Sequence, residues 1–79
     1  MIFLIEYDRK GGHLLRFQRY SDEKRREADR DRLDLDIELN RAGVTSHEVV
    51  ILEATDEAAI RRTHRRYFET LEQLLGAPV

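Results

Sequence analysis

Residues 55–75, TDEAAIRRTHRRYFETLEQLL, decide the fold, because they form the clearest helix in the chain. Their apolar residues recur three, four and seven positions apart, as one face of an α-helix requires. These apolar residues are Ile60, Tyr67, Phe68, Leu71, Leu74 and Leu75. His64 falls on the same face. The segment therefore predicts a helix that begins at a Thr55 cap, packs on a core and ends at Gly76.

Two strands are expected before this helix, at residues 2–9 and 13–20. Both are rich in β-branched and aromatic residues, and two adjacent glycines between them indicate a hairpin turn. A two-residue turn would place the aromatic face of the first strand beside polar residues. A three-residue turn at residues 10–12 places it beside Leu15 and Phe17 instead. Burial of the aromatic side chains favours the three-residue turn.

Residues 22–42 combine two conflicting periodicities. Within them, residues 33–40, LDLDIELN, alternate between apolar and acidic or polar types, which taken alone indicates a strand. Against this stand a serine or aspartate cap at the start, a glycine at the end and many helix-favouring residues between them. We therefore predict a helix. It would carry two apolar stripes, and the stripe formed by Leu33 and Ile37 would point away from the other.

Residues 47–54, HEVVILEA, are apolar on both faces, as expected of a strand that is covered on both sides. The element order predicts one α+β domain, ββαβα, over residues 1–76, followed by a loose tail at 77–79. The long helix should make the third strand parallel to the second, and pairing beside the first strand gives the order 2-1-3. Both helices are expected to pack on one face of this three-stranded sheet, which would leave the other face open.

Composition restricts the classes of function. The chain has no cysteine, and its three histidines are too scattered to indicate a metal site, so we expect no metal and no cofactor. Fourteen lysines and arginines nearly balance 16 acidic residues, which argues against a surface that is basic throughout, as nucleic-acid binders have. The apolar run at residues 1–5 is too short for a signal peptide or a membrane span. A cytoplasmic location and no membrane contact are expected.

The outer side of the final helix carries a candidate anion- or partner-binding patch of four arginines. Its members are Arg61, Arg62, Arg65 and Arg66. Such a patch can bind phosphates, nucleic acid or the carboxylates of a protein partner. The alternative is a solvated face neutralised by the neighbouring Glu57, Glu69 and Glu72. The alternative is favoured, because no exposed aromatic residues or glycine-rich loop accompany the patch.

His64 is a candidate pH-sensitive or pocket residue, because imidazole titrates near neutrality. A small enzyme or ligand-binding domain centred on His64 would need a nucleophile or a second ligand beside it, and the spacing provides neither. A buried histidine that bonds to the backbone, a tyrosine or a carboxylate is the favoured interpretation. His13 and His47 are expected to be exposed polar residues. No catalytic residue is predicted, and an enzyme is not favoured.

Self-association is the expected activity. A 79-residue chain without disulfides is close to the size at which one core supplies only a few kcal/mol of net stability. A second copy could bury the open sheet face and the spare helix stripe. The candidate interface residues are Ile2, Leu4, Leu14, Leu33 and Ile37. The sequence thus predicts a non-enzymatic, homodimeric protein-interaction module, with an anion or nucleic-acid binder and a His64-centred site as the alternatives.

Overall fold

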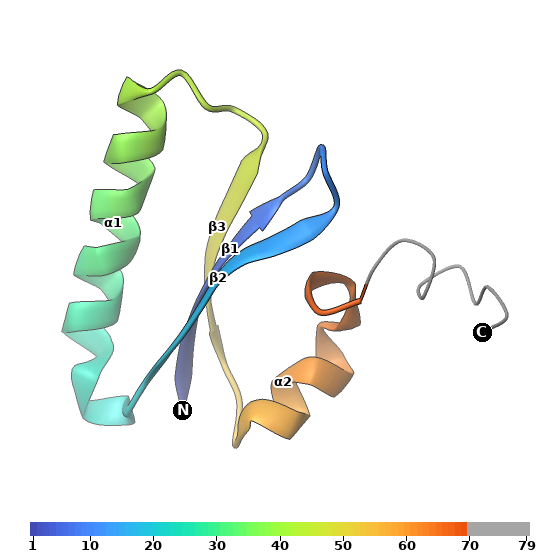
Figure 1. Ribbon diagram of the computed structural model, residues 1–79. Coiled ribbons are helices and arrows are strands. Elements are labelled where there is room, and N and C mark those ends of the chain that lie inside the picture. Colours follow the sequence, from blue (N-terminus) through green and yellow to red (C-terminus); the bar gives the residue numbers. More distant parts are fainter. Residues whose placement is uncertain (70–79) are drawn as a thin grey trace, which may run out of the picture.

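The computed structural model describes residues 1–69, and every structural statement below concerns that part of the chain. The predicted helix residues Leu71, Leu74 and Leu75 and the predicted tail at 77–79 lie outside it. The elements are strand β1 (Ile2–Asp8), strand β2 (His13–Tyr20), 3-10 turn η1 (Asp22–Lys24), helix α1 (Arg25–Arg41), strand β3 (His47–Glu53), helix α2 (Glu57–Thr63) and 3-10 turn η2 (Arg65–Tyr67). The predicted α+β architecture is confirmed (Figure 1).

The three strands form one sheet in the order β2-β1-β3. The central strand β1 is antiparallel to both neighbours, so β2 and β3 run in the same direction. This strand order and direction are those that the sequence predicted. Six of the seven β1 residues are buried, because this strand has a neighbour on each edge and packed side chains on each face.

The two helices cover opposite faces of the sheet (Figure 1). Ile2 of β1 packs in a cluster with Ala28 of α1. Ile5 and Tyr7 point to the other face and pack in a second cluster with Tyr67 of η2. The expectation that both helices share one face is therefore wrong. The physical reason is that β1 is apolar at consecutive positions, so both of its faces need cover.

The hairpin has the predicted register over most of its length. Ile5 lies opposite Phe17, as a three-residue turn requires. Nearer the turn, Leu15 is an extra residue in a β-bulge, so the loop spans residues 9–12 instead of 10–12. Gly12 has a φ of 74°, a conformation that glycine adopts without steric cost. The bulge turns Leu15 outward, where the sequence analysis had expected it to face the core.

Residues 33–40 are helical, as predicted. Ala28 and Leu35 are the buried residues of α1, and they face the sheet. Leu33 and Ile37 are 52% and 40% exposed, so the second apolar stripe lies on the outer surface of the helix. The helix packs on the sheet through small or aliphatic residues on one side. The alternation of apolar and acidic residues at 33–40 arises because the outer side of the helix is exposed, and not because the backbone is extended.

The final helix begins one residue later than predicted. The side chain of Asp56, rather than that of Thr55, caps α2: its Oδ1 atom accepts a hydrogen bond from the Ala59 amide at 2.7 Å. An aspartate at this position also places negative charge at the positive end of the helix dipole.

The continuous helix expected over residues 55–75 is interrupted at His64, whose φ of −126° and ψ of 51° are not helical. Just before it, the Thr63 hydroxyl donates to the Ala59 carbonyl at 3.0 Å, a contact that often bends a helix. The turn η2 that follows brings Tyr67 edge-on to Tyr7, with ring centroids 5.3 Å apart. The break thus directs Tyr67 into the core.

Candidate functional site

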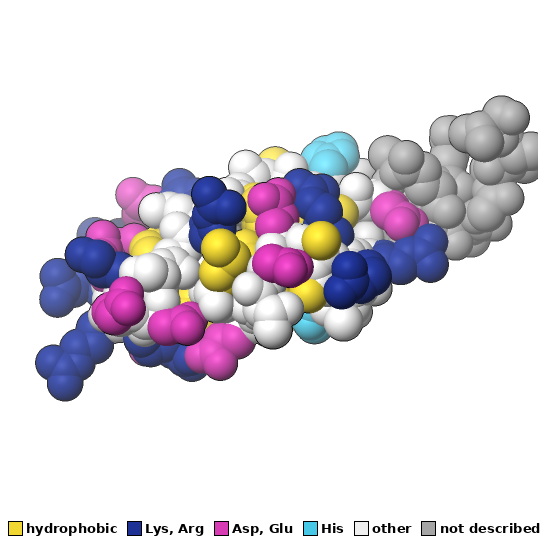
Figure 2. Space-filling view, turned by 90° about the horizontal axis from the view of Figure 1, so that it is seen from below, with side chains coloured by type: hydrophobic (Ala, Val, Ile, Leu, Met, Phe, Trp, Pro, Cys, Tyr) yellow, Lys and Arg dark blue, Asp and Glu magenta, His cyan; other side chains and the backbone are white. Residues whose placement is uncertain are grey.

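The arginine patch is largely neutralised by carboxylates of the same chain. The ion pairs are Arg61 with Glu57 at 2.8 Å, Arg65 with Glu69 at 2.9 Å and Arg66 with Glu48 at 2.7 Å. Within residues 1–69, Arg62 is exposed and forms no ion pair. Glu72, the third predicted partner, lies outside the described residues. At the end of the molecule where α1 and α2 begin, acidic and basic side chains are interspersed (Figure 2).

Two of these arginines also pack on aromatic rings that join the α2–η2 segment to the sheet. The Arg61 guanidinium lies 4.7 Å from the ring centroid of Phe68. The Arg66 guanidinium lies 4.3 Å from the ring centroid of Tyr67. Such cation–π contacts hold the cation over the ring face. The same guanidinium groups lie 5.7 Å from the Phe17 ring of β2 and 5.8 Å from the Tyr7 ring of β1, so they help to fix this segment on the sheet.

A polar network connects η2 with the start of β3. The Tyr67 hydroxyl donates to a carboxylate oxygen of Glu48, and Arg66 donates to the same carboxylate at 2.7 and 3.0 Å. The hydrogen bond from Tyr67, helped by the nearby Arg66, lowers the pKa of Glu48 below its ordinary value of 4.5. Burial, together with the bond to Glu48, raises the pKa of Tyr67 to about 12. Glu48 and Tyr67 are 19 residues apart, so no local sequence pattern predicts this network.

Replacing Glu48 by glutamine should weaken the fold at neutral pH and reduce its sensitivity to acid. A carboxyl with a lowered folded-state pKa stabilises the fold above its unfolded pKa and loses that stabilisation as the pH falls through the folded value. We expect the wild type to lose stability below about pH 4.5, and Glu48→Gln to be about 1–2 kcal/mol less stable near neutrality.

Urea unfolding at a series of pH values between about 3 and 7 measures both effects. Glu23→Gln is a suitable control, because Glu23 is exposed and forms no ion pair within residues 1–69. The stabilisation by Glu48 is contradicted if the two variants lose stability in parallel over this pH range.

Of the three histidines, His13 is exposed, as predicted, and the other two are half-buried. His64, predicted to be mostly buried, lies at the junction of α2 and η2, 6.2 Å from Tyr67 between ring centroids. His47 is also half-buried, and its Nδ1 atom is 2.7 Å from Oε2 of the buried Glu6. Sequence reasoning could not find this pair, because 41 residues separate its members. Among residues 1–69, neither the His47 ring nor the His64 ring is hydrogen-bonded to a serine or threonine hydroxyl.

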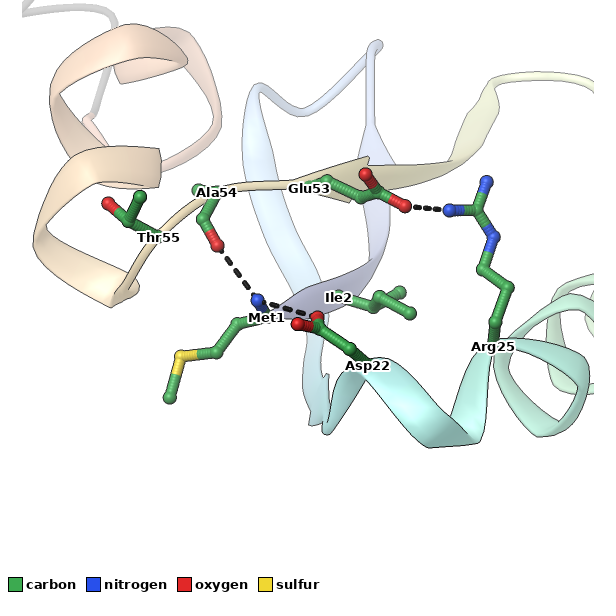
Figure 3. Close-up of a pocket in the computed structure, with 7 residues that line it drawn as sticks. All are labelled: Met1, Ile2, Asp22, Arg25, Glu53, Ala54 and Thr55. Carbon is green, nitrogen blue, oxygen red and sulfur yellow. Dashed lines mark hydrogen bonds and ion pairs between the residues drawn. The ribbon is translucent and has the colours of Figure 1, made fainter.

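A shallow cavity of about 580 Å³ lies where β1 begins and β3 ends (Figure 3). It is lined by Met1, Ile2, Asp22, Arg25, Glu53, Ala54 and Thr55. Its charged groups bind one another. The terminal amine donates to the Ala54 carbonyl at 2.9 Å and pairs with Asp22 at 2.9 Å, while Arg25 pairs with Glu53. A ligand in this cavity would therefore meet charged groups that are already paired with one another.

Two further findings concern the described part of the chain. No group of three or more acidic or histidine side chains in residues 1–69 is arranged to hold a metal ion. None of the helices described is both long and apolar enough to cross a membrane.

The candidate interface residues separate into buried and exposed sets. Ile2 and Leu4 are 2% and 0% exposed and belong to the core beneath α1. Leu14 is half-buried beside the cluster on the opposite face. Leu33 and Ile37 remain on the outer surface of α1. The open sheet face from which an interface was predicted does not exist, because α1 covers one face and the α2–η2 segment packs on the other.

Strand β3 offers a different surface, which the sequence analysis did not identify. Within residues 1–69 it pairs with β1 along one edge, and no strand pairs along its other edge. Six of its seven residues, from His47 to Leu52, are half-buried, and only Glu53 is exposed. Four of them are consecutive aliphatic residues at 49–52. An edge strand with such an apolar run is a template for pairing with another strand.

The direction of the backbone groups of β3 follows from the bonds at its two ends. The Met1 amino group donates to the Ala54 carbonyl at 2.9 Å, and the Ala54 amide donates to the Met1 carbonyl at 3.1 Å. At the other end of β3, the Arg9 amide donates to the Ser46 carbonyl at 2.9 Å. In an antiparallel pair such bonds recur at every second residue. The even-numbered residues of β3 therefore bond to β1, and the N–H and C=O groups of Val49 and the other odd-numbered residues point outward.

The other edge of the sheet, β2, is less suited to pairing. The bulge at Leu15 interrupts its regular backbone. Arg16 and Arg19 place positive charge along it, and β2 contains no acidic residue. Bulges and charged side chains are the features by which natural sheets protect their edges from association. Strand β3 has no bulge, and its charged residues Glu48 and Glu53 lie on either side of the aliphatic run at 49–52.

In comparisons with known proteins, no family model, curated protein or solved structure matches this chain.

Proposed function

We propose that this chain is a non-enzymatic protein-interaction module that acts as a homodimer, with the outer edge of β3 as its association surface. The observation that carries the proposal is the half-buried aliphatic run at residues 49–52 on an edge whose outward backbone groups have no strand partner within residues 1–69. Strand addition to such an edge supplies main-chain hydrogen bonds for affinity and alternate side chains for specificity.

The other candidate surfaces support association less well. The arginines Arg61, Arg65 and Arg66 are occupied by carboxylates, which reduces their attraction for phosphates or nucleic acid. A second copy is the partner that a chain of this size gains most from, because burying apolar surface adds about 25 cal/mol per Å² to a small core. We include a cytoplasmic location in the proposal, since a chain without cysteine does not depend on an oxidising compartment.

Proline at Val49 should abolish the dimer while leaving the β1–β3 pairing intact. The Val49 amide points away from β1, so proline removes a hydrogen-bond donor from the free edge alone. By light scattering at tens of micromolar, we expect the wild type at about twice its chain mass of 9.4 kDa and Val49→Pro at the chain mass.

Arg19→Pro is the matched control, since it changes the outer edge of β2, and it should remain dimeric. Glu53→Pro, at the exposed end of β3, is a second test if Val49→Pro unfolds; circular dichroism identifies that case. The proposal is wrong if the wild type is a monodisperse monomer. It is also wrong if folded Val49→Pro and Glu53→Pro both stay dimeric.

A further inference from the structure

We infer that the β3 strands of two copies pair antiparallel in one register, with Val50 of each copy opposite Val50 of the other, so that two three-stranded sheets join into one of six strands. The inference rests on the proposed homodimer and specifies its geometry. Three observations carry it: the direction of the backbone groups along β3, the distribution of its side chains, and the charges on the neighbouring helix α1.

Symmetry limits the registers that β3 can adopt with itself. A two-fold axis perpendicular to the sheet makes the paired strands antiparallel and keeps α1 of both copies on the same face. Directly opposed residues in a sheet point to the same face. One residue must then lie opposite its own counterpart, and the central candidates are Val49, Val50 and Ile51.

Centring on Val50 gives the best match of side chains. On the α1 face, Val49 lies opposite Ile51 of the second copy, and His47 lies opposite its Glu53. On the other face, Val50 meets its counterpart. All seven residues of β3 then have a partner within β3. The match places aliphatic contacts in the middle, where cross-strand pairs are favourable. At each end it brings together polar residues that are already bonded within their own copy, His47 to Glu6 and Glu53 to Arg25.

The neighbouring registers pair unlike side chains. Centring on Val49 would place Val50 opposite Glu48 of the second copy and Ile51 opposite its His47. Centring on Ile51 would place Val49 opposite Glu53, and the ends of the strand would pair with residues beyond β3. The Val50 register does bring Leu52 opposite Glu48. Arg66 and Tyr67 already neutralise and bond that carboxylate, which reduces the cost of this contact.

The charges on α1 are compatible with this arrangement. On the side of α1 that reaches β3, Arg25 pairs with Glu53. Along that side, positive and negative residues alternate at helical spacing, and they form the intrahelical pairs Arg25–Asp29 at 3.8 Å and Arg32–Asp36 at 2.9 Å. Two antiparallel copies of such a helix can lie side by side on the joined sheet with opposite charges near one another. A stripe of one sign would repel its copy.

A single introduced cysteine reports the register, because the chain contains no cysteine of its own. Val50 directs its backbone groups to β1, so Val50 and its counterpart would form a non-hydrogen-bonded pair with Cα atoms about 4.5 Å apart. This separation lies within the range of a disulfide. We expect Val50→Cys to form a disulfide-linked dimer under mild oxidation.

Leu52→Cys is the matched control on the same strand and face. In the proposed register, position 52 lies four residues from its counterpart, about 13 Å along the strand, which is too far for a disulfide. We expect Val50→Cys to cross-link at least tenfold faster than Leu52→Cys. Val49→Cys should cross-link slowly as well, because it lies opposite position 51. The measurement is the rate of dimer formation on a non-reducing gel.

The outcomes separate the register from the homodimer. If the wild type is dimeric but Leu52→Cys or Val49→Cys cross-links faster than Val50→Cys, the register is wrong and the homodimer stands. If light scattering shows a discrete monomer, both are wrong. An open-ended polymer would indicate pairing of β2 with β3 of the next copy, which is not two-fold, and would also overturn the register.

Hydrogen exchange of the wild type tests the same geometry without a substitution, and it decides the matter if Val50→Cys does not fold. In the proposed dimer, the outward amides of Val49 and Ile51 become hydrogen-bonded. Their exchange should slow as protein concentration rises through the dimer dissociation constant, while the Val50 amide, already bonded to β1, should change less. Exchange of Val49 and Ile51 that does not depend on concentration in a dimeric sample would overturn the register.

Discussion

Leu4→Asp is expected to unfold the chain rather than to dissociate a dimer. Leu4 is 0% exposed in the central strand and packs in the cluster beneath α1. A carboxylate at this position would lose its hydration in an aliphatic environment. We expect a loss of about 4 kcal/mol or more, which is close to the whole stability of a domain this small. Circular dichroism and urea unfolding near neutral pH measure the loss.

Leu33→Asp provides the matched comparison, since it makes the same change on the outer side of α1. Leu33 is 52% exposed, so an aspartate there remains hydrated and should change stability by about 0.5 kcal/mol or less. A folded Leu4→Asp protein with the same urea midpoint as Leu33→Asp would contradict the burial of Leu4.

The comparison of these two leucines shows what periodicity could and could not predict. The helical periodicity of residues 22–42 and the strand pattern of residues 2–9 were sufficient for the elements and their order. Periodicity shows that the apolar residues of a helix lie on one side of it, but it does not say which face of the sheet that side covers. Residues 47–54, which are apolar on both sides, did indicate that both faces of the sheet are covered. The sequence predicts a dimer contact on the face that carries Ile2 and Leu4, whereas α1 of the same chain covers that face.

The outer edge of β3 could have been identified from the sequence, because two features of the sequence point to it. The predicted strand order 2-1-3 already placed β3 at an edge, and the run at residues 49–52 is aliphatic with no protecting lysine or proline. The polar contacts could not be found in this way. Glu6 with His47 and Glu48 with Tyr67 are common polar residues far apart in sequence, and the three-dimensional pairing of strands and turns brings them together.

The ending of α2 illustrates a limit of helical periodicity. The apolar spacing continues through His64, so the pattern predicted one uninterrupted helix. The structure breaks the helix there, because Tyr67 packs edge-on against Tyr7 and bonds to Glu48. Long-range packing of one tyrosine thus overrides the local helical preference of the residues before it.

Ile60→Ala is expected to cost about 2–5 kcal/mol of unfolding free energy. Ile60 is 0% exposed and is the single buried residue of α2. A helix of seven residues is far too short to be stable alone, so its helicity depends on this packing. The variant should therefore lose the α2–η2 contacts together, including the burial of Tyr67. Urea unfolding monitored by tyrosine fluorescence measures both effects.

Ile37→Ala makes the identical change on the exposed side of α1, where Ile37 is 40% exposed. It removes little buried surface and leaves no cavity, so it should cost less than about 1 kcal/mol. The two variants differ in burial and not in chemistry, so their difference measures how firmly α2 is attached to the sheet. Equal unfolding free energies would show that α2 contributes no buried core, and Tyr67 and Arg66 would then hold the segment on the sheet without Ile60.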